Sequence, residues 1–412
     1  MPDAHLDAYL DHAYLDHAAT TPMRPEAVAA MAPLLGEVFG NPSGSHRWAR
    51  LARRALDDAR DVVAEVLGAR PGEVVFTSGG TEADDLAVRG VLDAAGGRAA
   101  CSGVEHHAVL APVRASGGAV VPVDGYGRMD LDALHAELVG GRAGGAPVSV
   151  VSALLANNEV GTVQSIDEVA AVVRSASPTT VVHTDAVAAA PWLDLAVHAA
   201  AADLVTISGH KLGGPKGTGV LVVREGTPLA ARLLGGGQER ERRSGTPNVA
   251  GAVGLAAALA AVAAERSDLV ARTEALRARL VGGLVAAVPD AVVASPPDPA
   301  DRTPGTVLVC LPGVAREALL FLLDEAGLGA SWGSSCSSGA SQPSHVLAAM
   351  GVAPALAEGS LRLSLGWCST EADVDAALVA VPAAVARLRG DGRTAATELG
   401  VQAGGVRVGG GA

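Results

Sequence analysis

The residues best suited to chemistry in this sequence are Ser208-Gly-His-Lys211, which follow the strand-like run Asp203-Leu-Val-Thr-Ile207. Hydrogen-bonding side chains precede the lysine, and Gly213-Gly-Pro215 follows it. An amine held at the end of a strand can form a Schiff base with an aldehyde. A lysine at such a place is more often a solvated strand end, so the neighbouring segments must decide between the two interpretations.

A carboxylate ends a second apolar run. Asp185 follows Thr179-Thr-Val-Val-His-Thr184, so we expect it at the carboxyl end of a neighbouring parallel strand, where α/β sheets build their sites. Pyridoxal 5'-phosphate (PLP) needs a lysine for its aldehyde and a carboxylate that keeps its pyridine nitrogen protonated. Asp185 alone would be interpreted as a helix N-cap before Ala186. Together with Lys211, it favours a PLP site.

A phosphate site is predicted further upstream. Glu73-Val-Val-Phe-Thr77 has the pattern of a strand, and Ser78-Gly-Gly-Thr-Glu82 that of a glycine-rich turn opening a helix. The backbone N–H groups and the dipole at a helix start bind anions. Thr81 and Asp84 could instead form a capping box. In one chain with Lys211 and Asp185, the phosphate site is the stronger interpretation.

Composition limits the class of protein. The 412 residues are 49% hydrophobic and only 2% aromatic, which predicts a large core filled by small apolar residues. A net charge of −13 argues against direct binding to nucleic acid or to an anionic membrane. The apolar stretch 249–264 is shorter than the ~20 residues that span a bilayer, and no signal-peptide pattern opens the chain.

Cysteine usage indicates a reducing compartment. The four cysteines lie at positions 101, 310, 336 and 368, with no paired spacing. This scatter is typical of a cytosolic protein without a disulfide framework or a metal site. We therefore expect a cytoplasmic protein that binds no metal.

Strand-like and helix-like segments alternate along the chain. Short runs rich in valine at 148–154, 181–183, 204–207 and 220–223 are separated by Ala-rich stretches, which favours a mostly parallel sheet covered by helices. A strand at 306–310, a helix at 317–326 and a strand at 360–364 indicate a smaller second domain. A long helix is expected to precede it, with Pro247 at its first position.

Nine motifs in order carry a resemblance to a known family. They are Tyr14-Leu-Asp-His-Ala-Ala-Thr-Thr-Pro22, Gly40-Asn-Pro-Ser43, Thr77-Ser-Gly-Gly-Thr-Glu82, Glu105-His106, Asn157-Asn-Glu-Val-Gly161, Ser208-Gly-His-Lys211, Gly235-Gly-Gly-Gln-Glu239, Arg243-Ser-Gly-Thr246 and Ser334-Ser-Cys336. From about Tyr14 to Leu388, the chain resembles the cysteine desulfurases of the IscS/NifS type. These belong to the class V aminotransferase group of PLP fold type I.

The resemblance implies an α/β fold of the PLP-dependent transferase type I, with a mostly parallel sheet covered by helices and a smaller α+β C-terminal domain. The expected parts are an extension (1–13), a large PLP-binding domain (14–262), a small domain (263–389) and a flexible tail (390–412). The first residues of the large domain can pack with the small one. Residues 8–13 are repeated at 13–18, and only the second copy leads into the first motif.

The implied reaction takes sulfur from L-cysteine, releases L-alanine and leaves a persulfide on an enzyme thiol, which a sulfur-acceptor protein then receives, for example in iron–sulfur cluster assembly. Cys336 is the candidate thiol, because the small residues of Gly333-Ser-Ser-Cys-Ser-Ser-Gly339 leave its sulfur accessible. Cys101 and Cys310 are expected to be buried. Cys368 has no assigned role.

The other roles follow from the matched motifs. Lys211 binds the cofactor aldehyde, His106 stacks on the ring and handles protons, and Asp185 faces the pyridine nitrogen. Asn158 positions cofactor and substrate, whereas Asn157 can serve only nearby backbone. The remaining assignments are the phosphate ligands Gly80, Thr81, Ser208 and His210, the phosphate-binding Thr246 from the other subunit of a homodimer, and Arg362 for the substrate α-carboxylate.

One position departs from the family pattern. A glutamine is expected three residues after the aspartate, where it hydrogen-bonds the phenolic oxygen of PLP, but this chain has Ala188. Losing such a contact costs roughly 1.5–3 kcal/mol if nothing replaces it. Two alternatives therefore stay open at this point: a selenocysteine lyase or other carbon–sulfur lyase, and a PLP-binding scaffold with weakened activity. The acceptor surface is expected around Cys336 and segment 238–243, which could also be a solvated loop.

Overall fold

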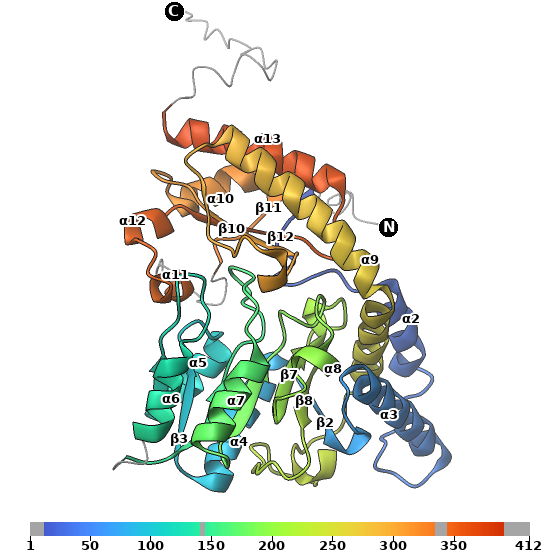
Figure 1. The fold of residues 1–412 in the computed structure, drawn as a ribbon. Helices are drawn as coiled ribbons and strands as arrows, with labels where there is room; N and C mark the ends of the chain where they lie inside the picture. The colour runs from blue at the N-terminus through green and yellow to red at the C-terminus, as the bar shows by residue number, and fades with distance from the viewer. Residues whose placement is uncertain (1–11, 141–144, 334–343, 391–412) are drawn as a thin grey trace, which may run out of the picture.

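The computed structural model describes residues 12–140, 145–333 and 344–390. Figure 1 shows a large sheet-and-helix part below a smaller C-terminal part, with one long helix running along both. Cys336 lies outside the described residues, as do residues 1–11 of the predicted extension and 391–412 of the predicted tail.

A seven-stranded sheet forms the centre of the larger part. Its order is β2-β8-β7-β6-β5-β3-β4, and β8 alone runs antiparallel to its neighbours. The strands are β2 (Val74–Thr77), β3 (Arg98–Ser102), β4 (Ala119–Val121), β5 (Val148–Ser152), β6 (Val181–Asp185), β7 (Leu204–Ser208) and β8 (Gly219–Val223). The prediction of a mostly parallel sheet is confirmed.

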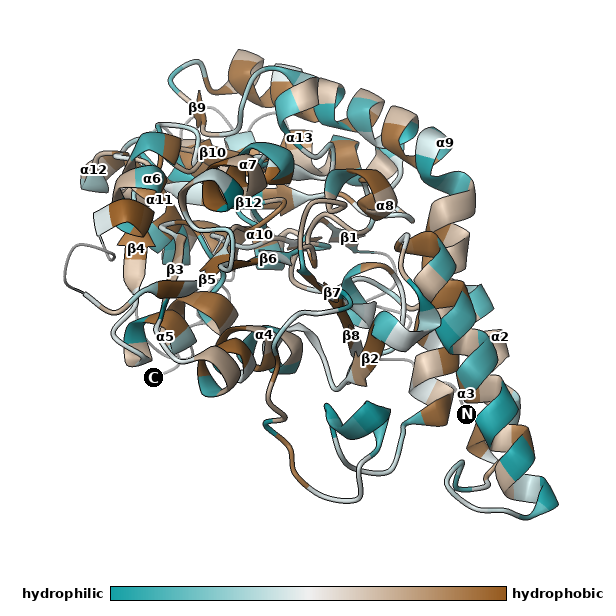
Figure 2. Cartoon of the chain, turned by 60° about the horizontal axis from the view of Figure 1, so that its bottom comes forward, coloured by the Kyte–Doolittle hydropathy of each residue, from teal (hydrophilic) through white to brown (hydrophobic). Residues whose placement is uncertain are grey.

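Side chains alternate between two hydrophobic cores on opposite faces of this sheet. Val205 packs with α7 (Ile166–Ala176) and α9 (Val249–Ala287) on one face. Leu204 packs with α4 (Gly80–Ala95) and α5 (His107–Ala115) on the other. Both cores need apolar residues, so both faces of these strands carry apolar side chains, and Figure 2 shows hydrophobic residues on β7 and β8. The covering helices are α3 (Arg47–Val66), α4 (Gly80–Ala95), α5 (His107–Ala115), α6 (Leu131–Gly140), α7 (Ile166–Ala176) and α8 (Leu195–His198).

The smaller part has its own core. It contains an antiparallel sheet in the order β12-β10-β9 and a short parallel pair of β1 with β11. Leu15 packs into this core, so a segment from early in the sequence completes the smaller part. The elements are β1 (Ala13–Tyr14), β9 (Val292–Val293), β10 (Thr306–Cys310), β11 (Leu328–Gly329), β12 (Ser360–Ser364), α10 (Arg316–Glu325), α11 (His345–Ala349), α12 (Pro354–Ala357) and α13 (Glu371–Leu388).

Helix α9 (Val249–Ala287) links the two parts. Asn248 caps it by accepting a hydrogen bond from the Gly251 N–H at 2.9 Å, so the prediction that Pro247 opens the helix is wrong. Its start packs closely on α2 (Pro25–Met31), where a Cβ on Gly254 would lie 2.5 Å from the Met31 sulfur. The predicted domain boundary at 262/263 falls inside α9 and stays a prediction.

Helix α9 also matters for membrane assignment. Among the described residues it is the one helix long and apolar enough to cross a bilayer, but 44% of its most apolar window is buried. It packs against α2, α3 and α13. These contacts are those of a core helix, and the helix is interpreted as one.

The remaining short elements are η1 (Ala32–Leu35), η2 (Pro71–Glu73), η4 (Gly209–Lys211), η5 (Glu239–Glu241) and η6 (Pro299–Asp301).

Candidate active site

A cavity of about 300 Å³ opens where β6, β7 and the start of α4 meet. This place is the carboxyl edge of parallel strands, as expected for an α/β sheet. It brings together eight of the predicted residues from the large part with Arg362 from the smaller one. The lining is Ala18, Ala19, Gly80, Thr81, Asp84, His106, Leu154, Asn158, Asp185, Val187, Ala188, Ser208, His210, Lys211 and Arg362.

Lys211 and Asp185 reach the cavity from adjacent strands. Asp185 ends β6, and Lys211 lies in the turn η4 directly after β7, which pairs in parallel with β6. The amine of Lys211 donates hydrogen bonds to the carbonyls of Ala18 and Ala19. Burial raises the pKa of Asp185 to about 6, against the lowering effects of the Val187 N–H and of Lys211. The site thus holds an amine near a buried carboxyl group.

The start of α4 supplies an anion site. Gly79 stands at the N-cap position with φ +156°, and it has no side chain to occupy the first N–H groups of the helix. The capping-box interpretation of Thr81 and Asp84 is therefore wrong. Gly219 of β8 approaches Gly79 so closely that a Cβ on Gly219 would lie 2.6 Å from the Gly79 carbonyl carbon. Backbone contact of this kind fixes the turn and leaves its amides for a phosphate.

The structure gives His106 and His107 different surroundings. His106 lines the cavity, and its Nδ1 accepts from the Ala108 N–H at 3.1 Å, so it is also the N-cap of α5. Burial, then Lys211, His107 and His345, lower the pKa of His106 to about 4. The ring is therefore neutral, with its proton on Nε2. His107 instead packs against the ring of His345 at 4.5 Å.

Arg362 reaches the cavity from β12 while its neighbours Leu361 and Leu363 enter the core of the smaller part. Its Nη1 donates to the carbonyls of Asn158 (3.1 Å) and Gly333 (2.9 Å), and its Nη2 to Asp16 Oδ1 (2.8 Å). The buried Nε has no hydrogen-bond partner in the part of the chain that the structure describes. A buried guanidinium with one unused donor is suited to an anionic ligand.

Asn157 performs the local task that the sequence allowed for it. Its Oδ1 accepts from the N–H groups of Glu159 (2.8 Å) and Val160 (3.0 Å), and its Nδ2 donates to the Val104 carbonyl. This side chain fixes the turn that presents Asn158 to the cavity.

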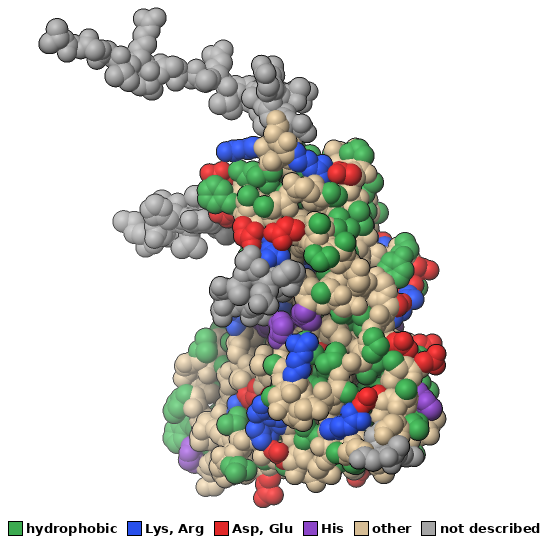
Figure 3. Space-filling model, turned by 90° about the vertical axis from the view of Figure 1, so that its left-hand side faces the viewer, with side chains coloured by type: hydrophobic (Ala, Val, Ile, Leu, Met, Phe, Trp, Pro, Cys, Tyr) green, Lys and Arg blue, Asp and Glu red, His purple; other side chains and the backbone are tan. Residues whose placement is uncertain are grey.

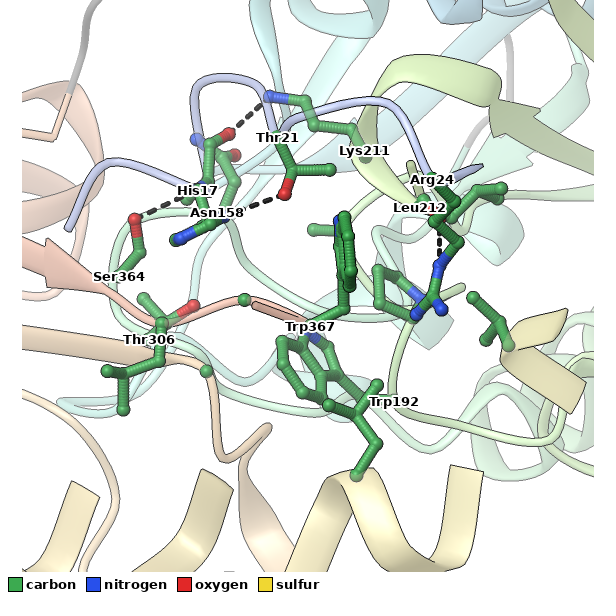
Figure 4. Close-up of a pocket in the computed structure, with 18 residues that line it drawn as sticks. His17, Thr21, Arg24, Asn158, Trp192, Lys211, Leu212, Thr306, Ser364 and Trp367 are labelled. Carbon is green, nitrogen blue, oxygen red and sulfur yellow. Dashed lines mark hydrogen bonds between the residues drawn. The ribbon is translucent and has the colours of Figure 1, made fainter. Parts of the chain in front are cut away.

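A smaller cavity of about 40 Å³ adjoins the first (Figure 4) and shares Ala18, Asn158, Ala188 and Lys211 with it. Figure 4 shows His17 and Asn158 toward one end, Arg24 and Leu212 toward the other, and Trp192 and Trp367 between them. Ala188 therefore borders both spaces. A longer side chain here would reach into one of them.

Some predicted residues do not meet at this site. Thr246 borders a different cavity of about 140 Å³, beside Ser78 and Gly217. Cys368 is exposed, whereas Cys101 and Cys310 are buried as expected. Segment 238–243 is not simply solvated, because the Glu239 side chain is 5% exposed and pairs with Arg60 at 2.7 Å.

A buried polar group that the sequence patterns did not predict lies beneath the cavity. His183 lies fully buried between Ser152 Oγ (2.8 Å) and Thr206 Oγ1 (3.1 Å), and its Nε2 is 3.5 Å from Asp84 Oδ1. Burial, followed by the charge of Asp185, raises the pKa of Asp84. The signal was available: Asp84 shares helical spacing with the buried Ala87, Val88 and Val91, which predicts an inward carboxyl group.

The residues present fit PLP. Lys211 offers an amine, Asp185 a carboxyl group and α4 an uncapped start, all around one cavity of suitable volume. Figure 3 shows that histidine side chains gather at the waist of the molecule, between its larger and smaller parts.

Comparisons with known proteins agree with this geometry. The sequence model of the family "Aminotransferase class-V" matches residues 13–377. The IscS-like cysteine desulfurase of Mycobacterium tuberculosis is 44% identical over 389 residues, covering 92% of this chain and 97% of the relative. A cysteine desulfurase of Cereibacter sphaeroides is 42% identical over 390 residues, with coverages of 92% and 97%. A solved NifS-like protein superposes with a TM-score of 0.82 at 33% identity, covering 90% of this chain and 98% of the other.

Proposed function

This chain belongs to the class-V aminotransferase family and is a cysteine desulfurase, and on that premise we propose that it binds PLP in the cavity around Lys211. The observation that carries this proposal is the meeting of Lys211, Asp185 and the uncapped start of α4 at one edge of the sheet. The residues that would hold the cofactor are Gly80, Thr81, His106, Asn158, Asp185, Ser208, His210 and Lys211.

Bound PLP supplies an electron sink for bonds to the substrate α-carbon. The chain's own residues supply position and protons. The Lys211 amine can exchange a proton with groups in the cavity once it leaves the carbonyls of Ala18 and Ala19. His106 can donate a hydrogen bond from its Nε2 to a group in the cavity, because its Nδ1 accepts from the Ala108 N–H. Because burial lowers the pKa of His106 to about 4, the ring stays neutral and acts through this hydrogen bond.

Arg362 is proposed to grip the α-carboxylate of L-cysteine. Its unused Nε and its cavity-facing position support this assignment, since guanidinium binds carboxylate through parallel hydrogen bonds. Asn158 offers its side chain from the same wall of the cavity. The substrate would then lie between Arg362 and Lys211.

Cys336 is the proposed sulfur acceptor within the enzyme. Its thiolate would attack the substrate sulfur, so that a sulfur–sulfur bond forms as the carbon–sulfur bond breaks and alanine leaves. The persulfide then passes to an acceptor protein, in agreement with a role in iron–sulfur cluster assembly. Cys336 lies outside the described residues, but Gly333, three positions before it, contacts Arg362.

A cytoplasmic homodimer is the proposed form. Apolar side chains that a second copy could cover are exposed on and beside η1 and α3, among them Leu35 (72%), Phe39 (70%) and Trp48 (47%). Thr246 does not line the Lys211 cavity of its own chain. We propose that it binds the phosphate of the partner subunit's cofactor.

Turnover of L-cysteine tests the proposal. The wild type should form alanine, and sulfide in the presence of a reductant, while Cys336→Ala should keep the cofactor absorbance and lose both products. Alanine formation at the wild-type rate by Cys336→Ala would exclude Cys336 as the attacking thiol and favour a lyase that needs no enzyme thiol.

A further inference from the structure

Asp84 is a buried carboxyl group that none of these steps uses. It lies one turn after Gly80 in α4, lines the Lys211 cavity and is only 1% exposed. Helix α4 packs on β5, β6 and β7, so Asp84 faces the sheet near the proposed anion site. A carboxyl group is expensive to bury, and its contacts therefore indicate what it does.

A column of buried polar side chains lies under Asp84 on these three strands. Ser152 Oγ on β5 is 2.8 Å from His183 Nδ1 on β6. His183 Nε2 is 3.1 Å from Thr206 Oγ1 on β7 and 3.5 Å from Asp84 Oδ1. Asp185 follows His183 by two positions, so it lies on the same face of the sheet, and it pairs in register with Thr206. The column therefore connects Asp84 with the carboxyl group proposed to face the cofactor ring.

Asp84 and Asp185 differ in the hydrogen bonds and charges around them. Asp185 Oδ1 accepts from the Val187 N–H at 2.9 Å, and the charge of Lys211 favours its ionised form. Asp84 Oδ1 accepts from none of the residues that the structure describes. Burial first, and then the charges of Asp185 and Glu105, raise the pKa of Asp84. An ionised carboxylate needs donors or a cation, so the negative charge belongs on Asp185 and a proton on Asp84.

We propose that Asp84 is a positioning residue for the cofactor: it carries a proton on Oδ1 toward His183 Nε2, and as a neutral group it leaves the negative charge to Asp185. This inference rests on the proposed binding of PLP. His183 then accepts at Nε2 and donates from Nδ1 to Ser152 Oγ. Asp84 also separates this polar column from the cavity, which keeps water away from the charge of Asp185 and strengthens its attraction for a protonated ring nitrogen.

Infrared spectroscopy of the full-length apoprotein at pH 7 tests the proton directly. The wild type should show the C=O stretching band of a protonated carboxyl group, and Asp84→Asn should lose it. A band from the buried Glu105 would remain in this variant. Asp85→Asn is the matched control, because Asp85 is the next residue of α4 but its side chain is 35% exposed and pairs with Arg89 at 3.2 Å. Its spectrum should match that of the wild type in this region.

Titration of the apoproteins with PLP tests the positioning role. Asp84→Asn keeps a neutral group of the same shape whose amide can donate to His183, so its affinity should stay within about twofold of the wild type. Asp84→Ala opens the polar column to water and should bind PLP about tenfold more weakly. If Asp84→Ala does not fold, Thr206→Val decides, since it removes only the hydroxyl group beside His183 and should weaken PLP binding about fivefold.

The outcomes are distinguishable. An unchanged carboxyl band in Asp84→Asn, or a PLP affinity of Asp84→Asn as low as that of Asp84→Ala, overturns this inference, because Asp84 would then be ionised. Wild-type affinity in Asp84→Ala, or in Thr206→Val where it decides, overturns it as well. Each of these results leaves the proposed function in place as long as the wild type binds PLP and turns over L-cysteine. A wild type that binds no PLP removes the proposed function itself, and this inference with it.

Discussion

The two sides of the cavity are built in different ways. The cofactor side, defined by Gly80, Asp185, Ser208, His210 and Lys211, stands at the ends of strands and at a helix start within one sheet. The substrate side, defined by Asp16, Asn158, Glu159, Gly333 and Arg362, is assembled from loops and from β12. Arg362 and its partner Asp16 are 346 positions apart in the chain.

This difference indicates that cofactor binding and substrate positioning depend on different parts of the molecule. On the cofactor side, the hydrogen-bonded strands and buried cores of the larger part fix most of the side chains. On the substrate side, position depends on contacts between the two parts, which small rearrangements can change. Changes on the cofactor side should therefore alter cofactor binding, whereas changes on the substrate side should leave it intact and alter turnover.

Lys211→Ala should have the largest effect, because no other amine is available to the cofactor aldehyde among the residues that line the cavity. Turnover of L-cysteine should fall on the order of 10⁴-fold or more. Mass spectrometry after borohydride reduction should find the cofactor attached to the wild type and not to the variant. Attachment at an unchanged level would mean that another lysine holds it.

Arg362→Ala should have the second largest effect on activity, and it tests whether the substrate side can fail while the cofactor side stays intact. Removing a buried, hydrogen-bonded charge costs about 2–4 kcal/mol of substrate binding, or roughly 30- to 10³-fold in kcat/KM. Cofactor absorbance should not change. Arg362→Lys keeps the charge but loses the planar fork, so steady-state kinetics should place it between wild type and alanine. Equal activity of all three would remove Arg362 from the substrate side.

The buried histidines around the cofactor side predict a pH dependence of stability. Burial lowers the pKa of His183 to about 3, and those of His17, His106 and His210 to about 4, from the usual 6.5. Between pH 6.5 and 4 the unfolded chain therefore binds more protons, and the free energy of unfolding falls as the pH falls. Asp185, whose pKa is raised to about 6, acts in the opposite direction and weakens the fall.

Urea unfolding of the apoprotein at pH 6.5 and 4.5 measures this effect. In His183→Gln the loss of stability between these values should be smaller than in the wild type by roughly 1–3 kcal/mol. Identical losses in both proteins would show that His183 is protonated in the folded state or exposed to solvent.

Ala188→Gln should have the smallest effect and should strengthen the cofactor side. The added amide can reach either of the two cavities that Ala188 borders. If it hydrogen-bonds the cofactor, affinity for PLP should rise by about 1 kcal/mol, roughly fivefold, in a titration of the apoprotein. Ala200→Gln, at an exposed position, is the control. A weaker affinity in Ala188→Gln alone would mean that the amide obstructs the cavity.

The fold was largely predictable because its signals are local. Valine-rich strands, glycine turns and the Ser208-Gly-His-Lys211 motif each depend on a few adjacent residues. The exact start of α9 was not, since Asn248 competes with Pro247 as the first helical signal and the side-chain cap prevails. The start of α4 was also ambiguous in the sequence, because Thr81 is a possible N-cap close to Gly79, which is the N-cap in the structure.

The substrate side was less predictable because its partners are far apart in sequence. Nothing near Arg362 indicates that Asp16 and the carbonyls of Asn158 and Gly333 surround it. Glu159 was part of a recognised motif, yet its contact with Ser344 depends on how the two parts pack. His183 and Asp84 likewise meet only because α4 covers β6.

Titration of the apoprotein with PLP, comparing Asp185→Ala with Arg362→Ala, tests the division between the two sides most directly. The account predicts that Asp185→Ala weakens PLP binding by about tenfold or more, while Arg362→Ala binds PLP like the wild type but turns over L-cysteine poorly. Equal loss of PLP affinity in both variants, or normal affinity in Asp185→Ala, would contradict it.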